Sequence, residues 1–340
     1  MSRVEYLVRR LIMALGVIAG VTVITFTLSQ VVPSDPARLY AGARARPEQV
    51  AAIRQQLGLD ESIVRQFQKY AGRLLRGDLG ESFRTRRPIV EDLKVFLPAT
   101  LELVLLSTIV ALVGGISIGV LAAADHGKAF DTLGRLVTIS GVSIPAFWLA
   151  ILFQLLFFSS LGWLPAGGRI GRDVLLEAPI HVRTGFHLVD AALQGNWFAW
   201  RDALRHLVLP TAVLATYPVA LVARMTRAAM LEVLTEPYIT AAEAAGLPRR
   251  TILFRLALKN ALIPTLTVLG LSFAYSRTGA VLIELVFSWP GLGKYVTDAI
   301  VRTDFPVIVG VTLVVTVIYV SINLVIDLVQ LVLDPRIELK

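Results

Sequence analysis

Cysteine is absent from this 340-residue chain, which excludes disulfides, thiolate nucleophiles and cysteine-ligated metals. Charged residues are scarce: they make up 17% of the chain, whereas 55% is hydrophobic and the mean hydropathy is +0.69. One soluble core does not need so much apolar sequence, so the composition predicts an all-α polytopic membrane protein. The net charge of +8 suits anionic headgroups of a lipid bilayer, and no basic patch interleaved with aromatics indicates nucleic-acid binding.

Signatures of metal, nucleotide or nucleophile chemistry are also lacking. The four histidines have no i, i+4 pair and no carboxylates at ligand spacing, so no metal site is predicted. No Gly-x-x-x-x-Gly-Lys-Ser/Thr phosphate loop occurs, so we expect this chain to bind no cofactor and another chain to hydrolyse any ATP. Residues 115–119 match the Gly-x-Ser-x-Gly pattern of serine hydrolases. They lie in an apolar run, however, where Gly115 and Gly119 predict a helix-packing seam, as Gly16 and Gly20 do nearer the N-terminus.

Uncharged runs predict six transmembrane helices, because about 20 residues at 1.5 Å each cross the hydrocarbon layer. The predicted helices cover residues 9–31, 98–124, 135–160, 205–229, 262–287 and 306–332. Arg9 and Arg10 place the N-terminus in the cytoplasm, and six crossings return the C-terminus to that side. We expect the first helix to be a retained anchor rather than a signal peptide. Pro145, Pro210 and Pro218 are expected to kink the third and fourth helices.

The segment between the first two predicted helices has helical punctuation of its own. Pro47 and Gly58 bracket one predicted helix. A second runs from near Ser62 to Gly77 and carries apolar residues on one face. We therefore predict three parts: residues 1–31 are the N-terminal tail and first helix, 32–97 an external helical lobe, and 98–340 the core with helices two to six. A second loop, 161–204, is rich in glycine and tryptophan and is expected along the outer surface.

A polar, alanine-rich island at about 230–262 interrupts the apolar core sequence. Its small side chains extend over a full helical turn, so the groove of another protein can approach the backbone closely. Arg249, Arg250, Arg255 and Lys259 follow and indicate the cytoplasmic side. The island is therefore predicted to contact a soluble partner, with a plain solvated loop as the alternative.

Ordered motifs along nearly the whole chain resemble the B-type membrane subunit of oligopeptide and dipeptide ATP-binding-cassette importers. They include Gly77-Asp78-Leu79-Gly80-Glu81-Ser82-Phe83, Leu97-Pro98-Ala99-Thr100-Leu101-Glu102-Leu103, Gly162-Trp163-Leu164-Pro165-Ala166-Gly167-Gly168 and Phe287-Ser288-Trp289-Pro290-Gly291-Leu292-Gly293. The resemblance implies a type I importer permease fold in a bacterial inner membrane. It also implies a heterodimer with a homologous permease, two cytoplasmic ATPase subunits that use ATP, and an extracytoplasmic solute-binding protein.

In that family the island corresponds to the "EAA" coupling loop, which sits in a cleft of the ATPase. The resemblance assigns ATPase coupling to Tyr238, Ala241, Ala242, Glu243, Ala244, Ala245, Gly246 and Leu247. One departure concerns the glutamate: the family spacing before Gly246 would place it at Thr240, whereas the literal Glu243 lies three residues later. A role for Glu243 by name is therefore doubtful.

Arg277 interrupts the fifth predicted helix, where a charge needs a compensating partner. Glu284 follows two helical turns later on the same face, so both residues are predicted to line the translocation pathway. Arg277 then binds a substrate carboxylate, such as a peptide C-terminus. Snorkelling to the outer interface, or pairing with another subunit, explains it equally well.

Two classes of function remain open at this stage. The favoured one is a pore-forming subunit of an ATP-driven importer of di- or oligopeptides, although relatives of this type also carry nickel chelates, glutathione or opines. The alternative is a self-sufficient secondary transporter driven by an ion gradient. Such a protein is expected to show intramembrane acidic relays or broken helices in inverted repeats, and these signals are weak in this sequence.

Overall fold

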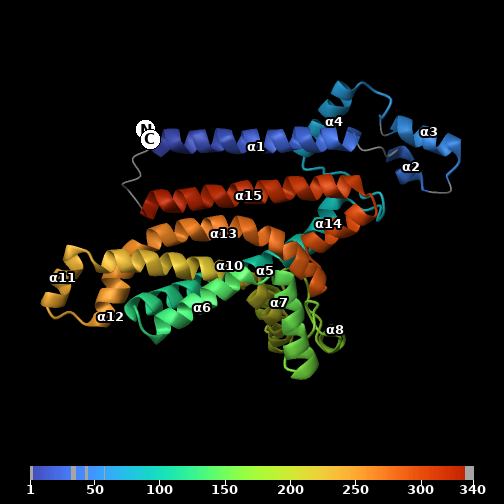
Figure 1. The fold of residues 1–340 in the computed structure, drawn as a ribbon. Helices are drawn as coiled ribbons and strands as arrows, with labels where there is room; N and C mark the ends of the chain where they lie inside the picture. The colour runs from blue at the N-terminus through green and yellow to red at the C-terminus, as the bar shows by residue number, and fades with distance from the viewer. Residues whose placement is uncertain (1–2, 32–35, 43–44, 57, 334–340) are drawn as a thin grey trace. The chain divides into compact units, whose positions relative to one another are not determined.

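The computed structural model describes residues 3–31, 36–42, 45–56 and 58–333 (Figure 1), and every regular element within them is a helix. The long helices are α1 (Arg3–Val31), α5 (Ile89–Ala124), α6 (Ala129–Ser143), α10 (Trp197–Leu234), α13 (Leu258–Val286) and α15 (Phe305–Leu333). Shorter helices are α2 (Pro36–Ala41), α3 (Pro47–Gln56), α4 (Ile63–Leu75), α7 (Ala146–Phe153), α8 (Arg172–Glu177), α9 (His187–Leu193), α11 (Pro237–Ala244), α12 (Arg249–Thr251) and α14 (Leu292–Val301). Two π-helical turns are η1 (Gln154–Ser160) and η2 (Ile252–Ala257).

The helices match the six predicted membrane spans, with one difference in the third. Among the described residues, five stretches are long and apolar enough to cross a bilayer: Val8–Leu28, Ile89–Ala124, Trp197–Leu234, Arg249–Val268 and Phe305–Val325. The sixth candidate is the pair Ala129–Ser143 and Ala146–Ser160, which counts as one span only if a bend of 106° between its halves is accepted. Residues 334–340 lie outside the described residues, so the predicted side of the C-terminus stays a prediction.

The expectation of a simple kink at Pro145 was wrong, because the third span is broken there. Ile144 adopts an extended backbone with φ −87° and ψ 124°, the conformation that a following proline favours for steric reasons. Beyond the break, the Gln154 side chain donates to the carbonyls of Ala166 at 2.7 Å and Val286 at 3.2 Å. The half-span α7–η1 is thereby fastened to two other segments. Pro210 and Pro218, in contrast, lie inside the single helix α10.

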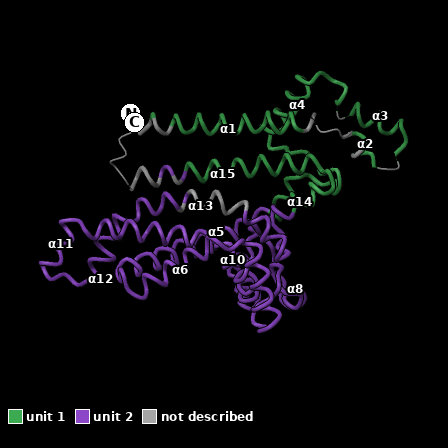
Figure 2. The backbone as a smooth tube through the Cα atoms, in the orientation of Figure 1, with its two compact units in different colours: residues 1–96, 295–324, 338–340 green, residues 97–294, 325–337 purple. Residues whose placement is uncertain are grey.

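The chain divides into two compact units (Figure 2), and unit 1 contains residues 1–96 and 295–324. Hydrogen bonds join distant parts of this unit. The Ser82 hydroxyl donates to Asp304 at 2.5 Å, and the Tyr295 hydroxyl donates to Asp92 at 2.9 Å. Burial and the neighbouring Asp92 carboxylate both raise the pKa of Tyr295, so its hydroxyl remains a proton donor. The predicted helices within 32–97 are present as α3 and α4, and α2 is an additional short helix in that segment.

Unit 2 contains residues 97–294 and the end of α15 from Val325, and α10 is its central helix. The predicted packing seam is confirmed in α5, where glycine allows close contact with α10. A Cβ atom built on Gly115 would lie 2.6 Å from the Val222 Cβ, and one on Gly119 would lie 2.6 Å from the Thr226 Cβ. No described heavy atom lies within 4 Å of a Cβ built on Gly16 or Gly20, so the described residues of unit 1 form no seam there.

Candidate coupling segment

The residues predicted to couple to an ATPase, from Tyr238 to Leu247, lie in helix α11 and the turn after it, and residues 237–247 are called the coupling segment. Pro237 occupies the first turn, where a missing N–H costs nothing and the fixed φ suits the helix. Gly246 ends the segment in the left-handed region at φ +75°. The Gly246 N–H donates to the backbone carbonyl of Glu243 at 2.9 Å, and the Leu247 N–H donates to the backbone carbonyl of Ala242 at 3.1 Å. These are the two hydrogen bonds of a Schellman motif. The segment is therefore a short capped helix.

Two side chains of α11 point inward and hold it against unit 2. Ile239 is 1% exposed and Ala242 is 7% exposed. Both belong to an apolar cluster formed with the ends of neighbouring helices and built from Val120, Ala123, Ala229, Met230, Ile252, Ala257 and Ala261. Tyr238 adds a polar link, because the Asn260 side chain on α13 donates to its hydroxyl at 2.7 Å. The helix is thus packed on one side and bonded at its start.

The opposite face of α11 is open. Of the residues predicted to couple to an ATPase, seven are exposed: Tyr238, Ala241, Glu243, Ala244, Ala245, Gly246 and Leu247. The eighth, Ala242, faces the protein's own core and does not belong to this open face. No described heavy atom lies within 4 Å of a Cβ built on Gly246, so the surface there is unobstructed. Apart from Glu243 the open face is uncharged, and four of its seven residues are alanine or glycine.

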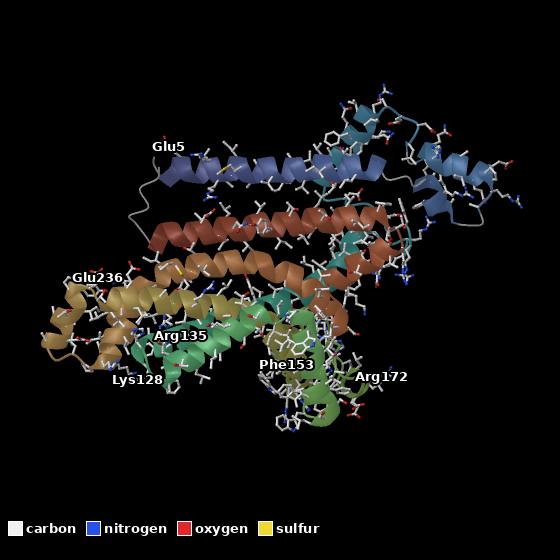
Figure 3. The ribbon with its side chains drawn as sticks, in the orientation of Figure 1. Glu5, Lys128, Arg135, Phe153, Arg172 and Glu236 are labelled. Atoms are coloured by element: carbon white, nitrogen blue, oxygen red, sulfur yellow. The ribbon has the colours of Figure 1, made fainter. Side chains whose placement is uncertain are left out.

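Arg249 connects the next short helix, α12, to the end of α5. Pro248 precedes α12 in an extended conformation, and the Arg249 guanidinium donates to the Ala124 carbonyl. The last carbonyls of a helix lack partners within the helix, so a cation there is favoured by both hydrogen bonding and the helix dipole. Figure 3 labels Glu236 beside α11 and Lys128 near α12, at the opposite end of α10 from Arg172 in α8. The hydrogen bond from Arg249 to Ala124 thus joins α12, which follows the coupling segment, to the end of α5.

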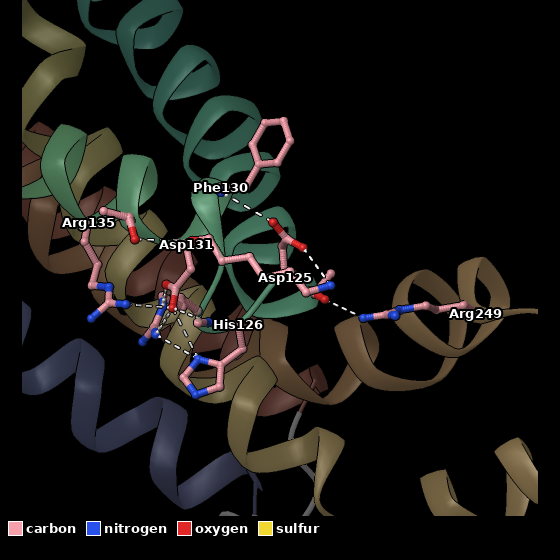
Figure 4. Close-up of polar contacts among 11 residues, drawn as sticks. Asp125, His126, Phe130, Asp131, Arg135 and Arg249 are labelled. Carbon is pink, nitrogen blue, oxygen red and sulfur yellow. Dashed lines mark hydrogen bonds and ion pairs between the residues drawn. The ribbon is translucent and has the colours of Figure 1, made fainter.

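Asp131 is the centre of a polar cluster in the same region, at the start of α6 (Figure 4). Its carboxylate is fully buried and forms a bidentate ion pair with Arg227 of α10. The Arg227 Nε donates to it at 2.6 Å and the Nη2 at 3.0 Å. Arg135 donates at 2.9 Å and the Gly127 N–H at 3.0 Å. Sequence reasoning missed this cluster, although Arg227 lies within a predicted membrane helix, where a charge requires a partner.

Glu284 is placed differently from its predicted role. The side chain is 0% exposed, accepts from the Thr100 hydroxyl at 2.6 Å and from the Lys294 N–H at 3.1 Å, and therefore faces protein rather than a water-filled space. A Cβ on Gly291 would lie 2.2 Å from the Glu284 carboxylate, which explains the glycine in this turn. The side chain of Arg277 lies outside the described residues, so the proposed alignment of the two stays a prediction.

The 161–204 segment is folded more tightly than an extended surface loop. Arg169 and Glu102 form a buried ion pair at 2.5 Å, and the Leu188 N–H donates to the same carboxylate at 2.8 Å. Asp190 accepts backbone N–H groups from 183–185, and these bonds outweigh burial and lower its pKa. Burial, reinforced by Arg169, lowers the pKa of His187 to about 4. Among the described residues, no three or more His, Asp or Glu side chains are arranged to hold a metal.

Comparisons with known proteins agree along the whole chain. The family described as "Binding-protein-dependent transport system inner membrane component" matches residues 115–339, and the corresponding N-terminal family matches residues 3–104. A probable D,D-dipeptide transport system permease protein of Escherichia coli K12 is 50% identical over 321 residues, 94% of each chain.

Two further relatives extend this similarity. A dipeptide transport system permease protein of Alkalihalophilus pseudofirmus is 41% identical over 98% of this chain and 99% of its own. A di/tripeptide transport system permease protein of Pseudomonas aeruginosa is 42% identical over 98% of both. The chain therefore belongs to the family of binding-protein-dependent transport system inner membrane components and is a multi-pass membrane permease subunit.

Proposed function

We propose that this permease imports short peptides at the expense of ATP hydrolysed by partner subunits, and that the open face of α11 is its contact with an ATPase. The observation that carries the proposal is the pairing of an exposed small-residue face with an inward anchor at Ile239 and Ala242. Small side chains let a groove approach the helix backbone, and the anchor makes α11 move with the helices behind it. A plain solvated loop would need neither feature.

The remaining partners follow from membership of a binding-protein-dependent family. A homologous permease completes the translocation pathway, two ATPases bind on the cytoplasmic side, and a solute-binding protein delivers substrate from outside. The arginines that flank α11, with Arg9 and Arg10, favour a cytoplasmic location for this end and for both termini. The peptide substrate is supported by three relatives whose names specify dipeptides or di- and tripeptides.

Arg277 is the proposed substrate contact, with its guanidinium binding the C-terminal carboxylate of a peptide in transit. Glu284 supports the pathway indirectly in this proposal, because its carboxylate holds the turn that ends α13. Arg277→Leu is expected to lower the uptake of peptides with a free carboxylate while uptake of amidated peptides is unchanged. Uptake of free-carboxylate peptides by the assembled variant at the level of the native complex would remove Arg277 from the pathway.

The coupling role is tested by filling the open face with a bulky ring. Ala241→Trp is expected to leave unit 2 folded, because Ala241 is exposed, but to weaken co-purification of the ATPase and to lower transport. Ala52→Trp, at an exposed alanine of α3, is the matched control and should retain both. Transport and ATPase activity are measured in vesicles that contain the reconstituted complex. Full transport by the Ala241→Trp complex, with its ATPase bound, contradicts the proposed contact.

A further inference from the structure

Helix α4 has three chemically distinct faces. The first packs on α1 through Phe67 and Tyr70, whose rings lie 5.2 Å and 5.6 Å from the Phe26 ring. The second is apolar and uncovered: Val64 is 67% exposed and Leu75 is 90% exposed. These two residues are eleven positions, or about three turns, apart and point in nearly the same direction. A side chain this apolar is unfavourable in water, so the second face requires an apolar environment.

The third face of α4 is basic. Arg65, Lys69 and Arg73 within the helix and Arg76 at its end are all exposed, and the helix itself carries no acidic residue. Lys69 is paired with Glu61 at 2.6 Å. The other three are arginines, whose planar guanidinium groups suit phosphate oxygens. Basic and apolar residues on separate faces of one helix are typical of a helix that lies in the plane of a membrane surface.

Contacts with α1 indicate the depth of α4. The apolar stretch of α1, Val8–Leu28, has 21 residues and therefore spans about 32 Å, close to the thickness of the hydrocarbon layer. The Tyr70 hydroxyl lies 3.4 Å from the Thr25 hydroxyl, and Thr25 is three residues, or about 4.5 Å, from the end of that stretch. Helix α4 thus crosses α1 where hydrocarbon meets headgroups (Figure 1), the level that tyrosine side chains favour.

We propose that α4 is an interfacial membrane helix whose apolar face, with Val64 and Leu75, is immersed in lipid and whose arginines bind anionic headgroups. Continuity with the membrane span of α1 favours lipid over a protein as the occupant, because α4 contacts α1 at Thr25 and Phe26, close to the end of that span. Arg65, Arg73 and Arg76 complement a negative surface, where each basic side chain contributes about a fivefold preference. The lobe that follows α1 is then held at the membrane surface rather than free in solution.

The absence of cysteine makes a labelling test straightforward. Single cysteines at Val64 and Leu75 carry a bimane fluorophore in the full-length chain, reconstituted in nanodiscs, and Gln55→Cys on an exposed position of α3 is the control. The two α4 labels are expected to be quenched by nitroxide lipids and protected from iodide, with the reverse at Gln55. Quenching by iodide at Val64 and Leu75 overturns the proposal. Protection from both quenchers overturns it as well, since a protein then covers the face.

The choice of headgroup is tested with the same Leu75→Cys label. Nitroxide-labelled phosphatidylglycerol is expected to quench it at least several-fold more efficiently than nitroxide-labelled phosphatidylcholine. The triple variant Arg65→Gln, Arg73→Gln, Arg76→Gln should abolish this preference. A matched triple variant at exposed arginines outside α4, Arg38→Gln, Arg46→Gln, Arg84→Gln, should retain it. Equal quenching by both lipids in the native sequence overturns the assignment of the basic face to anionic headgroups.

Discussion

Three glycines in one turn and a half of α5 offer a graded test of how closely α5 packs on α10. A Cβ on Gly114 would lie 3.9 Å from Val219, which is ordinary contact. A Cβ on Gly115 would lie 2.6 Å from the Val222 Cβ, and one on Gly119 would lie 2.7 Å from the Ala223 carbonyl oxygen. Since carbon atoms pack at about 3.5–4 Å, alanine at either of the last two positions must separate the helices by about 1 Å.

The expected free energies follow from two opposing effects. Replacing a helical glycine by alanine favours the helix by about 1 kcal/mol, whereas overpacking a close interface costs about 1–3 kcal/mol. Gly114→Ala should therefore be neutral or stabilising. Gly115→Ala meets the Val222 Cβ, which is fixed to the backbone, but its nearest backbone atom is 3.1 Å away, so it should be destabilising to a smaller extent than Gly119→Ala. Gly119→Ala meets backbone, which cannot turn aside, so its cost should lie near the upper limit and leave a net loss of about 2 kcal/mol.

Reversible unfolding of the purified chain by SDS in bicelles measures these differences, with a fluorescent fusion on size exclusion to confirm that each variant is monodisperse. The order of stability should be Gly114→Ala, native, Gly115→Ala, Gly119→Ala. If Gly119→Ala is as stable as Gly114→Ala, the close approach of α5 and α10 is not present in the folded protein, and the packing argument is refuted.

Two further predictions concern charged groups. The folded-state pKa of His187, about 4, lies below its ordinary value of 6.5, so the unfolded segment binds more protons between these values, and the stability of 161–204 should fall as the pH drops from 6.5 towards 4. Hydrogen exchange at pH 7 and pH 5 checks this, and His187→Phe should remove the difference. At the other end, Asp131→Arg should prevent accumulation of the chain and Arg227→Asp should partly restore it, measured by membrane abundance. Arg135→Gln should be nearly neutral, because that side chain is 53% exposed. If the double variant Asp131→Arg, Arg227→Asp accumulates no better than Asp131→Arg alone, the two residues do not form a direct pair.

Features with a local cause were predictable from the sequence. Long apolar runs indicate spans because each run must by itself cross the hydrocarbon layer, and Pro47 and Gly58 bracket α3 because each acts on its own backbone. The capped end of α11 at Gly246 is of the same kind. The ion pairs Asp131–Arg227 and Glu102–Arg169 were missed. Their members are 96 and 67 residues apart in the sequence, so the sequence around one residue does not identify its partner.

The sequence also could not predict how strongly a residue such as Pro145 disturbs its helix. Proline at 145 predicts a disturbed helix, but whether the result is a kink or a 106° break depends on what receives the second half. Here the Gln154 side chain binds carbonyls of Ala166 and Val286, and the latter is 132 residues away. Likewise Glu284 resembles a pathway residue when only its helix is considered. Its burial depends on Thr100 and on the turn around Gly291 and Gly293, which come together only in the folded chain.

The contacts around α11 also bear on how unit 2 would respond to a force applied there. The helix is bonded to α13 through Tyr238 and Asn260, and α12 is bonded to the end of α5 through Arg249. The α5–α6 turn is in turn tied to α10 by the Asp131–Arg227 pair. A displacement of α11 must therefore move the ends of α5, α10 and α13 together or break several polar contacts at once. Packed interfaces shift between discrete arrangements rather than deform continuously, so we expect this end of unit 2 to move as one block.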